Sequence, residues 1–202
     1  MVTLVIETAT AACSVALLGG ARVLAAAHEV VGRGHAERLV PMVAGLIAGH
    51  PVPDAILVDC GPGSFTGVRV GLAAARAFGL AWGAPVTGYS SLALIAAMAD
   101  VSEPIAVAIP GGHGELFVQR FTAAPRDEAG PLRSLPPAQA AEAIADVHVY
   151  GGGAAALIAA RGFGEAHDLL PDAARIAHLP EALRGREPSP LYGRAPDAKL
   201  PA

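Results

Sequence analysis

The chain has 202 residues, of which 53% are hydrophobic and 16% are charged, and its formal net charge at pH 7 is −4. A chain of this length and composition can bury a substantial core without disulfides or metal ions. The small negative net charge excludes a strongly basic nucleic-acid-binding surface on this chain alone, so we expect any contact with RNA to be indirect and to depend on a basic partner.

The two cysteines and the N-terminal segment indicate a cytoplasmic location. Cys13 and Cys60 lie far apart in apolar, strand-like runs with no second metal-type ligand beside them, so we expect buried, reduced thiols. The start of the chain lacks the basic region of a signal peptide. Arg69 and Arg76 interrupt the longest apolar stretch, and we therefore expect no membrane span.

Strand-like and helix-like patterns alternate along the first half of the chain. Three strand-like runs with short breaks between them are typical of an antiparallel meander, and helices then alternate with further strands. The predicted strands are 3–9, 13–19, 22–31, 55–60 and 85–90, and the predicted helices are 35–50, 65–82 and 92–100. The first half is therefore predicted to form a βββαβαβα unit.

A shorter version of this order follows a break at 100–104. Its predicted strands are 105–109, 115–121 and 147–151, and its predicted helices are 137–146 and 154–162. We place a boundary near residue 101, which gives an N-terminal lobe, 1–100, and a C-terminal lobe, 101–202. The Pro-rich tail of the second lobe, 187–202, is expected to hold little regular structure. The sequence thus predicts an α/β protein with two lobes, the second abbreviated.

The segment GPGSFTGVRVGLAAARAFGLAWG at 61–83 leads from a strand into an apolar helix. Its glycines could present backbone N–H groups to a phosphate. However, Thr66 stands where a dinucleotide fingerprint needs a third small residue, and the Gly-Lys-Ser/Thr end of a P-loop is missing. Ser64 lacks the flanking glycines of an esterase elbow. We therefore predict that Ser64 is the N-cap of the helix.

Small residues recur every four positions along this helix, at Gly67, Gly71, Ala75, Gly79 and Gly83. A glycine in a helix interior costs about 1 kcal/mol relative to alanine, so close packing against another backbone must offset that cost. Two interpretations remain open: a helix covered entirely by its own domain, or a helix with one side on its sheet and the other on a partner protein. In the second case Arg69 and Arg76 could meet carboxylates of the partner.

Other motifs give weak signals. The run VYGGGAAAL at 149–157 resembles a nucleotide-binding turn through Gly151, Gly152 and Gly153, but a tight strand-to-helix connection is the simpler interpretation. His113 and Glu115 match the H-x-E of zinc deaminases without the required P-C-x-x-C. None of the seven histidines falls at metal-ligand spacing with another. We therefore expect no metal site and no cofactor.

Four motifs occur in a characteristic order: IETAT at 6–10, HAERLVPMV at 35–43, GPGSFTGVRVG at 61–71 and YGRAPDAK at 192–199. With them the chain resembles the TsaB (YeaZ) family, the bacterial partner subunits of the machinery that makes threonylcarbamoyladenosine beside the tRNA anticodon. The resemblance implies the two-lobed fold of actin, sugar kinases and heat-shock ATPases, a ribonuclease H-like fold with mixed sheets.

The resemblance also implies a set of partners. Family members are regarded as non-catalytic; they pair with a TsaD-like transferase, or with themselves as a homodimer when alone, through a helical bundle, and a TsaE-like ATPase joins the complex. The helices at 35–50 and 65–82 match the bundle. The interface residues so implied are His35, Leu39, Met42, Val43, Gly67, Val68, Gly71, Leu72, Ala75 and Gly79.

The chain departs from the family pattern in two places. Glu7 stands where relatives often have Asp, and 110–112 reads Pro-Gly-Gly where many relatives carry Asp-Ala-Arg. Both changes argue against a working phosphotransfer site, leaving Glu7 and the 151–153 glycines as possible residual nucleotide contacts. A nucleotide-binding ATPase or small-molecule kinase is the alternative function. A peptidase is a third, for which no nucleophile, base and orienting acid can be assembled.

Overall fold

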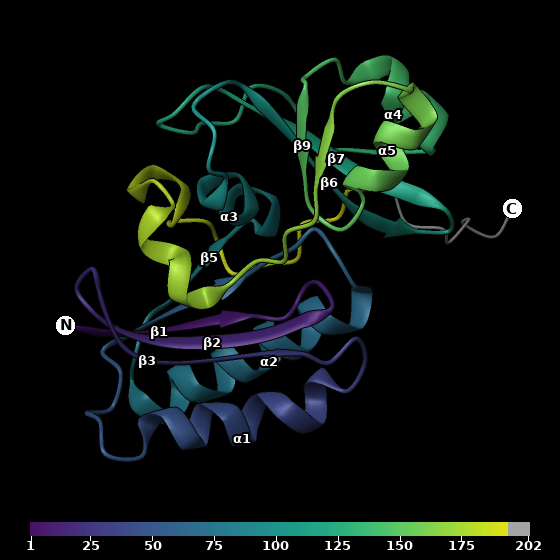
Figure 1. The fold of residues 1–202 in the computed structure, drawn as a ribbon. Coiled ribbons are helices and arrows are strands. Elements are labelled where there is room, and N and C mark those ends of the chain that lie inside the picture. Colours follow the sequence, from purple (N-terminus) through teal and green to yellow (C-terminus); the bar gives the residue numbers. More distant parts are fainter. Residues whose placement is uncertain (194–202) are drawn as a thin grey trace, which may run out of the picture.

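Two mixed five-stranded sheets form the framework of the computed structural model, which describes residues 1–193 (Figure 1). The first sheet has the order β3-β2-β1-β4-β5 and the second the order β10-β9-β6-β7-β8. In each sheet an antiparallel meander, β1–β3 or β6–β8, is extended by parallel strands. The predicted α/β class with mixed sheets is confirmed.

The first half of the chain supplies the first sheet and three helices. Its strands are β1 (Val2–Glu7), β2 (Ala12–Gly19), β3 (Arg22–Val30), β4 (Ala55–Asp59) and β5 (Val86–Tyr89), and its helices are α1 (His35–Ile47), α2 (Phe65–Trp82) and α3 (Ser91–Met98). The order is the predicted one. The helix predicted over 35–50 ends at Ile47, and the Ser64 side chain accepts a hydrogen bond from the Gly67 backbone N–H, which confirms Ser64 as the N-cap of α2.

The second half supplies the second sheet. Its strands are β6 (Ile105–Gly112), β7 (Glu115–Phe121), β8 (Arg133–Leu135), β9 (His148–Tyr150) and β10 (Glu165–His167), its helices are α4 (Pro137–Ala143) and α5 (Ala154–Arg161), and two 3-10 helices follow, η1 (Ala173–His178) and η2 (Glu181–Leu183). β8, β10 and the 3-10 helices were not predicted from the sequence. Each of these elements has only three to six residues, too few for a hydrophobic period to emerge.

Helices cover the sheets in layers, which explains their apolar patterns. In Figure 1, α1 and α2 lie together on one face of the first sheet, and α4 and α5 lie on the outer side of the second. Between the sheets lies α3, whose residues 91–96 are all buried. It shares one core with Val5 and Leu57 of the first sheet and with Val107 and Phe117 of the second. A helix apolar on every side needs such cover on every side.

After β10 the chain returns to the first sheet. The Ser14 hydroxyl donates to the Asp172 carboxylate, and the Ala173 N–H donates to that hydroxyl, so η1 is fixed on β2. Further along, the Gly88 N–H donates to the Arg186 carbonyl, and the Leu191 N–H donates to the Cys60 carbonyl. Backbone hydrogen bonds therefore hold the final described segment beside β5 and the end of β4. Residues 194–199 of the predicted tail motif lie outside the described residues.

Within residues 1–193, no helix is both long enough and apolar enough to cross a bilayer.

Candidate protein-interaction face and inter-sheet cavity

The row of small residues on α2 faces the chain's own first sheet. Gly67, Gly71, Ala75 and Gly79 are all buried. A Cβ atom at Gly67 would collide with the Thr8 carbonyl oxygen, and one at Gly79 would lie 2.6 Å from Cγ2 of Val86. The glycines thus admit Thr8, which directly follows β1, and Val86 of β5 in the same molecule. The row is therefore not an open groove in this structure, because the chain's own residues already occupy the space beside it. A four-residue repeat of small residues suits packing on a sheet as well as packing on a partner helix.

The predicted interface residues of α1 also point inward. Leu39, Met42 and Val43 are at most 6% exposed and belong to the core between the helices and the first sheet. His35 is 6% exposed, and its Nε2 lies 3.1 Å from the carbonyl oxygen of Ala12. Because a carbonyl can only accept, Nε2 carries the proton and donates. His35 therefore anchors the start of α1 to β2. Val68 and Leu72 of α2 are buried in the same core.

The opposite faces of α1 and α2 form an exposed apolar surface, which we call the outer helical face. Its uncharged members are exposed and mostly small: Ala36, Val40, Pro41 and Ala44 of α1, and Ala73, Ala77, Leu80 and Ala81 of α2. The exposed side chains of Glu37 and Arg76 lie beside them. Leu80 is 88% exposed and Val40 is 52% exposed. The two helices contact each other on the same side of the sheet (Figure 1). Exposed apolar surface shared by two adjacent helices is typical of a protein-interaction site.

The two arginines of α2 contact the end of the described chain. Arg69 donates to the Phe65 carbonyl and, at 2.6 Å, to the Tyr192 hydroxyl, and its guanidinium lies over the Phe65 ring. Arg76 donates to the Pro188 carbonyl at 2.7 Å. Both arginine side chains therefore have hydrogen-bond acceptors within this chain. Their presence in an apolar helix does not require carboxylates from a partner protein.

Glu7 and Asp59 form a buried acidic pair at the carboxyl ends of β1 and β4, two adjacent inner strands of the first sheet. Glu7 is 0% exposed, and its two carboxylate oxygens accept from the Ala9 N–H at 3.0 Å and the Tyr89 hydroxyl at 3.1 Å. Asp59 is equally buried; Oδ1 accepts from the Gly61 N–H, while Oδ2 has no hydrogen-bond partner among the described residues. Burial, followed by the negative charge of Asp59, raises the pKa of Glu7 well above its ordinary value. Burial raises the pKa of Asp59 to about 7.

Burial also disfavours the charged form of the two cysteine thiols, which makes them unreactive. Cys13 and Cys60 are free and buried, as expected. Burial raises the pKa of Cys13 to about 11 and that of Cys60 to about 12, so neither forms the thiolate needed for nucleophilic or metal chemistry.

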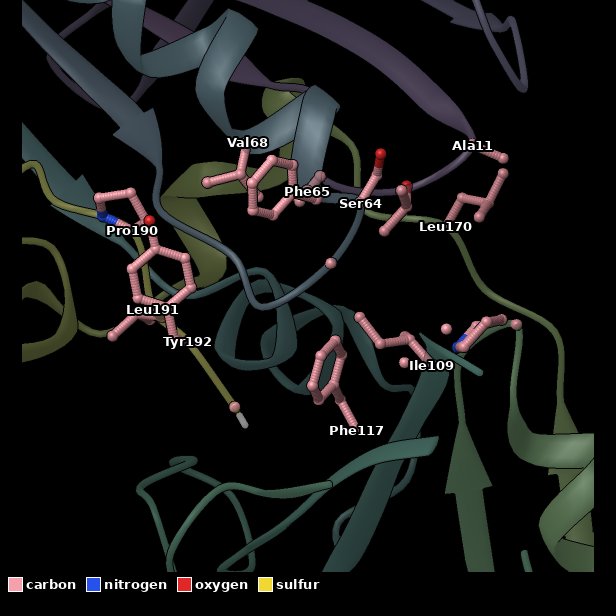
Figure 2. A pocket seen from close by; sticks show the side chains of 18 of the residues that line it. Ala11, Ser64, Phe65, Val68, Ile109, Phe117, Leu170, Pro190, Leu191 and Tyr192 are labelled. Carbon is pink, nitrogen blue, oxygen red and sulfur yellow. The ribbon is translucent and has the colours of Figure 1, made fainter. Parts of the chain in front are cut away.

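A cavity of about 1060 Å³ lies between the two sheets. Figure 2 shows Ile109 and Phe117 on one side of it, Phe65 and Val68 of α2 opposite, and Leu191 and Tyr192 of the C-terminal segment beside them. Other apolar and small residues, including those at 110–112, complete most of the lining. The cavity therefore has the apolar lining of a ligand or peptide site, without the cluster of cations that phosphates require.

Few of the predicted nucleotide contacts reach this cavity. Gly152 lines it, whereas Glu7, Gly151 and Gly153 do not. Gly151 has a φ of 108° and Gly153 donates from its N–H to the Ala108 carbonyl, so this turn packs tightly against β6. The simpler interpretation of the glycine run, a tight strand-to-helix connection, accounts for its geometry.

Comparisons with known proteins agree with this architecture. A family model described as TsaD, tRNA N6-adenosine threonylcarbamoyltransferase, matches residues 27–131. A Pseudomonas aeruginosa crystal structure, of a protein described as similar to peptidase YeaZ, is 32% identical with a TM-score of 0.82 and covers 96% of this chain and 99% of its own. YeaZ from Pseudomonas aeruginosa is 32% identical with a TM-score of 0.78, covering 95% and 99%.

Curated sequences give shorter matches. The Escherichia coli protein named tRNA threonylcarbamoyladenosine biosynthesis protein TsaB is 37% identical over 134 residues, which are 63% of this chain and 56% of the relative. The chain spans about half the length of the curated relatives it matches.

Two mixed sheets, each a meander extended by parallel strands and covered by helices, define a ribonuclease H-like α/β protein. The family model covers just over half of the chain, and the two Pseudomonas structures cover nearly all of it at 32% identity. The chain belongs to the TsaB (YeaZ) family. The resemblance drawn from the four sequence motifs is therefore confirmed.

Proposed function

We propose that this chain is a non-catalytic subunit that binds a TsaD-like transferase and supports formation of threonylcarbamoyladenosine beside the tRNA anticodon in the cytoplasm. A TsaE-like ATPase joins the same complex, tRNA is contacted only indirectly, and the isolated chain pairs with itself as a homodimer. Membership of the TsaB family supports the pathway, and the net charge of −4 supports the indirect role of tRNA.

The observation that carries the proposal is the outer helical face. Beside the exposed charged residues Glu37, Arg38 and Arg76, both helices turn several uncharged, mostly small side chains to solvent, so a partner helix can approach closely and exclude water along two adjacent ridges. Leu80 and Val40 are large enough to act as anchors in such a contact. The interface is therefore proposed on the solvent side of α1 and α2, rather than on the buried row that the family motifs suggested.

The buried acidic pair supports a non-catalytic role. The carboxylates of Glu7 and Asp59 are fully buried and do not line the cavity, so they are poorly placed to hold a metal–phosphate group there. Ser64 is engaged as a helix cap, and among the described residues no hydrogen bond links it to His113 or Asp168, the histidine and the carboxylate of the cavity wall. A serine-type peptidase would need those links.

The test is complex formation with the outer helical face altered. We expect Ala44→Arg and Ala77→Arg to weaken binding of the TsaD-like transferase at least tenfold, about 1.4 kcal/mol, because each places a long charged side chain in an apolar contact. Size-exclusion chromatography with light scattering measures the mass of the mixture, and titration calorimetry measures the affinity.

Ala156→Arg is the matched control, since Ala156 is an exposed alanine on α5, away from the outer helical face. It should bind as the unaltered chain does. If Ala44→Arg and Ala77→Arg fold and bind normally as well, this face is not the interface. Arginine at Gly71 would be uninformative, because a side chain there collides with Thr8 and disturbs the fold.

A nucleotide-dependent enzyme is the second candidate, and the cavity volume is the observation that favours it. Calorimetry with Mg-ATP on the isolated chain separates the two. Tight binding that Gly152→Val weakens would favour the enzyme, because Gly152 is the residue of the glycine turn that lines the cavity. Absence of binding is the result expected for a subunit without nucleotide chemistry.

A further inference from the structure

Two histidines and a glutamate meet at the edge of the second sheet, outside the surfaces described above. His148 lies on β9, and Glu165 and His167 lie on β10, the edge strand. Glu165 is the register partner of His148, and His167 follows two residues later. Since side chains alternate between the faces of a strand, all three point to the same side of the sheet. The intervening Val149 points to the other side, into the core against α4 and α5.

The three potential ligand atoms converge on one point. Nδ1 of His148 and Nε2 of His167 are 3.2 Å apart, and Oε2 of Glu165 lies 3.4 Å from the first nitrogen and 3.8 Å from the second. Zinc bonds to imidazole nitrogen and carboxylate oxygen are about 2.0–2.2 Å long, so two ligand atoms of a tetrahedral site lie about 3.3–3.6 Å apart. The observed edges of 3.2, 3.4 and 3.8 Å lie within about 0.2 Å of that range, so a small side-chain adjustment would form one face of such a tetrahedron.

The surroundings hold the imidazoles in place. The Tyr150 ring stacks on His167, with centroids 4.3 Å apart and planes 9° apart. The Tyr150 hydroxyl in turn donates to the Asp100 carboxylate. That hydrogen bond lowers the pKa of Asp100. Stacking on Tyr150 therefore limits the motion of the His167 ring, and the Asp100 carboxylate adds negative charge that favours a cation nearby.

The side-chain exposures leave room for a fourth ligand. The histidine side chains are 19% and 30% exposed, whereas Glu165 is 64% exposed. The triangle thus has one side toward solvent, from which water can complete the coordination. A mixed nitrogen and oxygen set with two imidazoles suits zinc and other transition metals, whereas calcium and magnesium require mainly oxygen ligands.

We propose that His148, Glu165 and His167 bind one zinc ion that ties the edge strand β10 to β9. The alternative is a hydrogen bond between the two rings with an ion pair to Glu165, which needs one imidazole proton between the nitrogens and no metal. The sequence prediction of no metal site considered spacing along the chain only. The ligands escape such a search because α5 separates the two strands that carry them.

The proposed ion has a defined structural role. β10 contains three residues and pairs with β9 alone. Asp168, the next residue, lines the inter-sheet cavity, and Asp172 accepts from Ser14 of the first sheet. Zinc would therefore fix the strand from which the chain crosses back to the first sheet. This role is independent of the proposed transferase contact.

The test uses the full chain, prepared without a histidine tag and treated with a chelator. We expect calorimetry with zinc chloride to give one site per chain, and cobalt(II) to give the strong visible absorption of tetrahedral coordination. His148→Gln and His167→Gln should each weaken zinc binding at least about tenfold. Zinc should raise the melting temperature of the unaltered chain and not that of these variants.

The matched control is His178→Gln, which alters an exposed histidine of η1 and should leave zinc binding unchanged. Should a histidine variant fail to fold, Glu165→Gln keeps the test decisive, because that side chain is mostly exposed, and it too should weaken binding. The proposal is overturned if the unaltered chain shows no saturable zinc binding, or if the affected variants bind zinc as tightly as the control.

Discussion

The hydroxyl of Thr8, the residue directly after β1, donates a buried hydrogen bond of 2.8 Å to the carbonyl oxygen of Gly67 in α2. This contact is possible because Gly67 and Gly71 have no side chain to keep the helix away from Thr8. The glycine row therefore sets the distance between α2 and its own sheet. Because that side of α2 is occupied by the sheet, a partner protein can contact only the outer helical face.

We expect Gly67→Ala to destabilise the fold by about 1–3 kcal/mol, because the new methyl group overlaps the rigid Thr8 backbone. This loss exceeds the gain of about 1 kcal/mol that alanine gives in a helix.

Chemical denaturation measures the free energy of unfolding. Gly45→Ala in α1 is the matched control, since a Cβ atom there meets no other atom within 4 Å, and it should stabilise the chain by up to about 1 kcal/mol. Equal effects of the two substitutions would contradict the assigned packing.

We expect the free energy of unfolding to fall as pH rises from about 4 toward 7. The pKa values of Glu7 and Asp59 are raised in the folded state, that of Asp59 to about 7, so over this range the folded chain holds more protons than the unfolded chain. Each extra proton contributes at most about 1.4 kcal/mol per pH unit.

Glu7→Gln should flatten this dependence in urea unfolding curves recorded at several pH values, while Glu37→Gln, at an exposed site on α1, should leave it as it was. A slope unchanged by Glu7→Gln would show that the pair does not titrate in this way.

We expect His35→Leu to destabilise the fold by about 1–3 kcal/mol, because the buried carbonyl of Ala12 loses the hydrogen bond from Nε2. Transferase binding by the folded variant should remain normal, since His35 lies under α1 rather than on its outer side. His35→Gln, which keeps a donor, should recover part of the lost stability. Weakened binding in a variant of unaltered stability would instead restore His35 as an interface residue.

We expect Leu80→Glu to reduce self-association of the isolated chain, because Leu80 is the most exposed large apolar side chain of the outer helical face. Light scattering over a range of concentrations measures the change. Val147→Glu is the comparison, since Val147 is 52% exposed and directly precedes β9. In Figure 1, β9 lies in the second sheet, away from α1 and α2. If both variants dimerise as the unaltered chain does, the homodimer uses another surface.

The order of the long elements could be predicted because their patterns are strong. The apolar runs of β1, β4 and β6 and the capped start of α2 are visible without a structure. The direction in which α2 faces was not predictable, since Gly67 and its successors suit a sheet and a partner helix equally. Leu80 appeared only as one of many apolar residues, and its 88% exposure needed the fold. The division into lobes at residue 101 stays a prediction.

The His148–Glu165–His167 cluster was hidden for a different reason. Its residues belong to two three-residue strands with a helix between them, so only strand pairing brings them together. A prediction of the register between β9 and β10 would have found it.

The position of α3 has a mechanical consequence. Leu92, Leu94 and Ile95 are completely buried in a core to which both sheets contribute. Rotating one sheet away from the other would expose these apolar side chains to water. Opening by a hinge, the motion by which many two-lobed enzymes admit and release their substrates, is thereby opposed by the hydrophobic effect. The shared core therefore holds the two sheets, and the helices on their outer sides, in a fixed relative orientation.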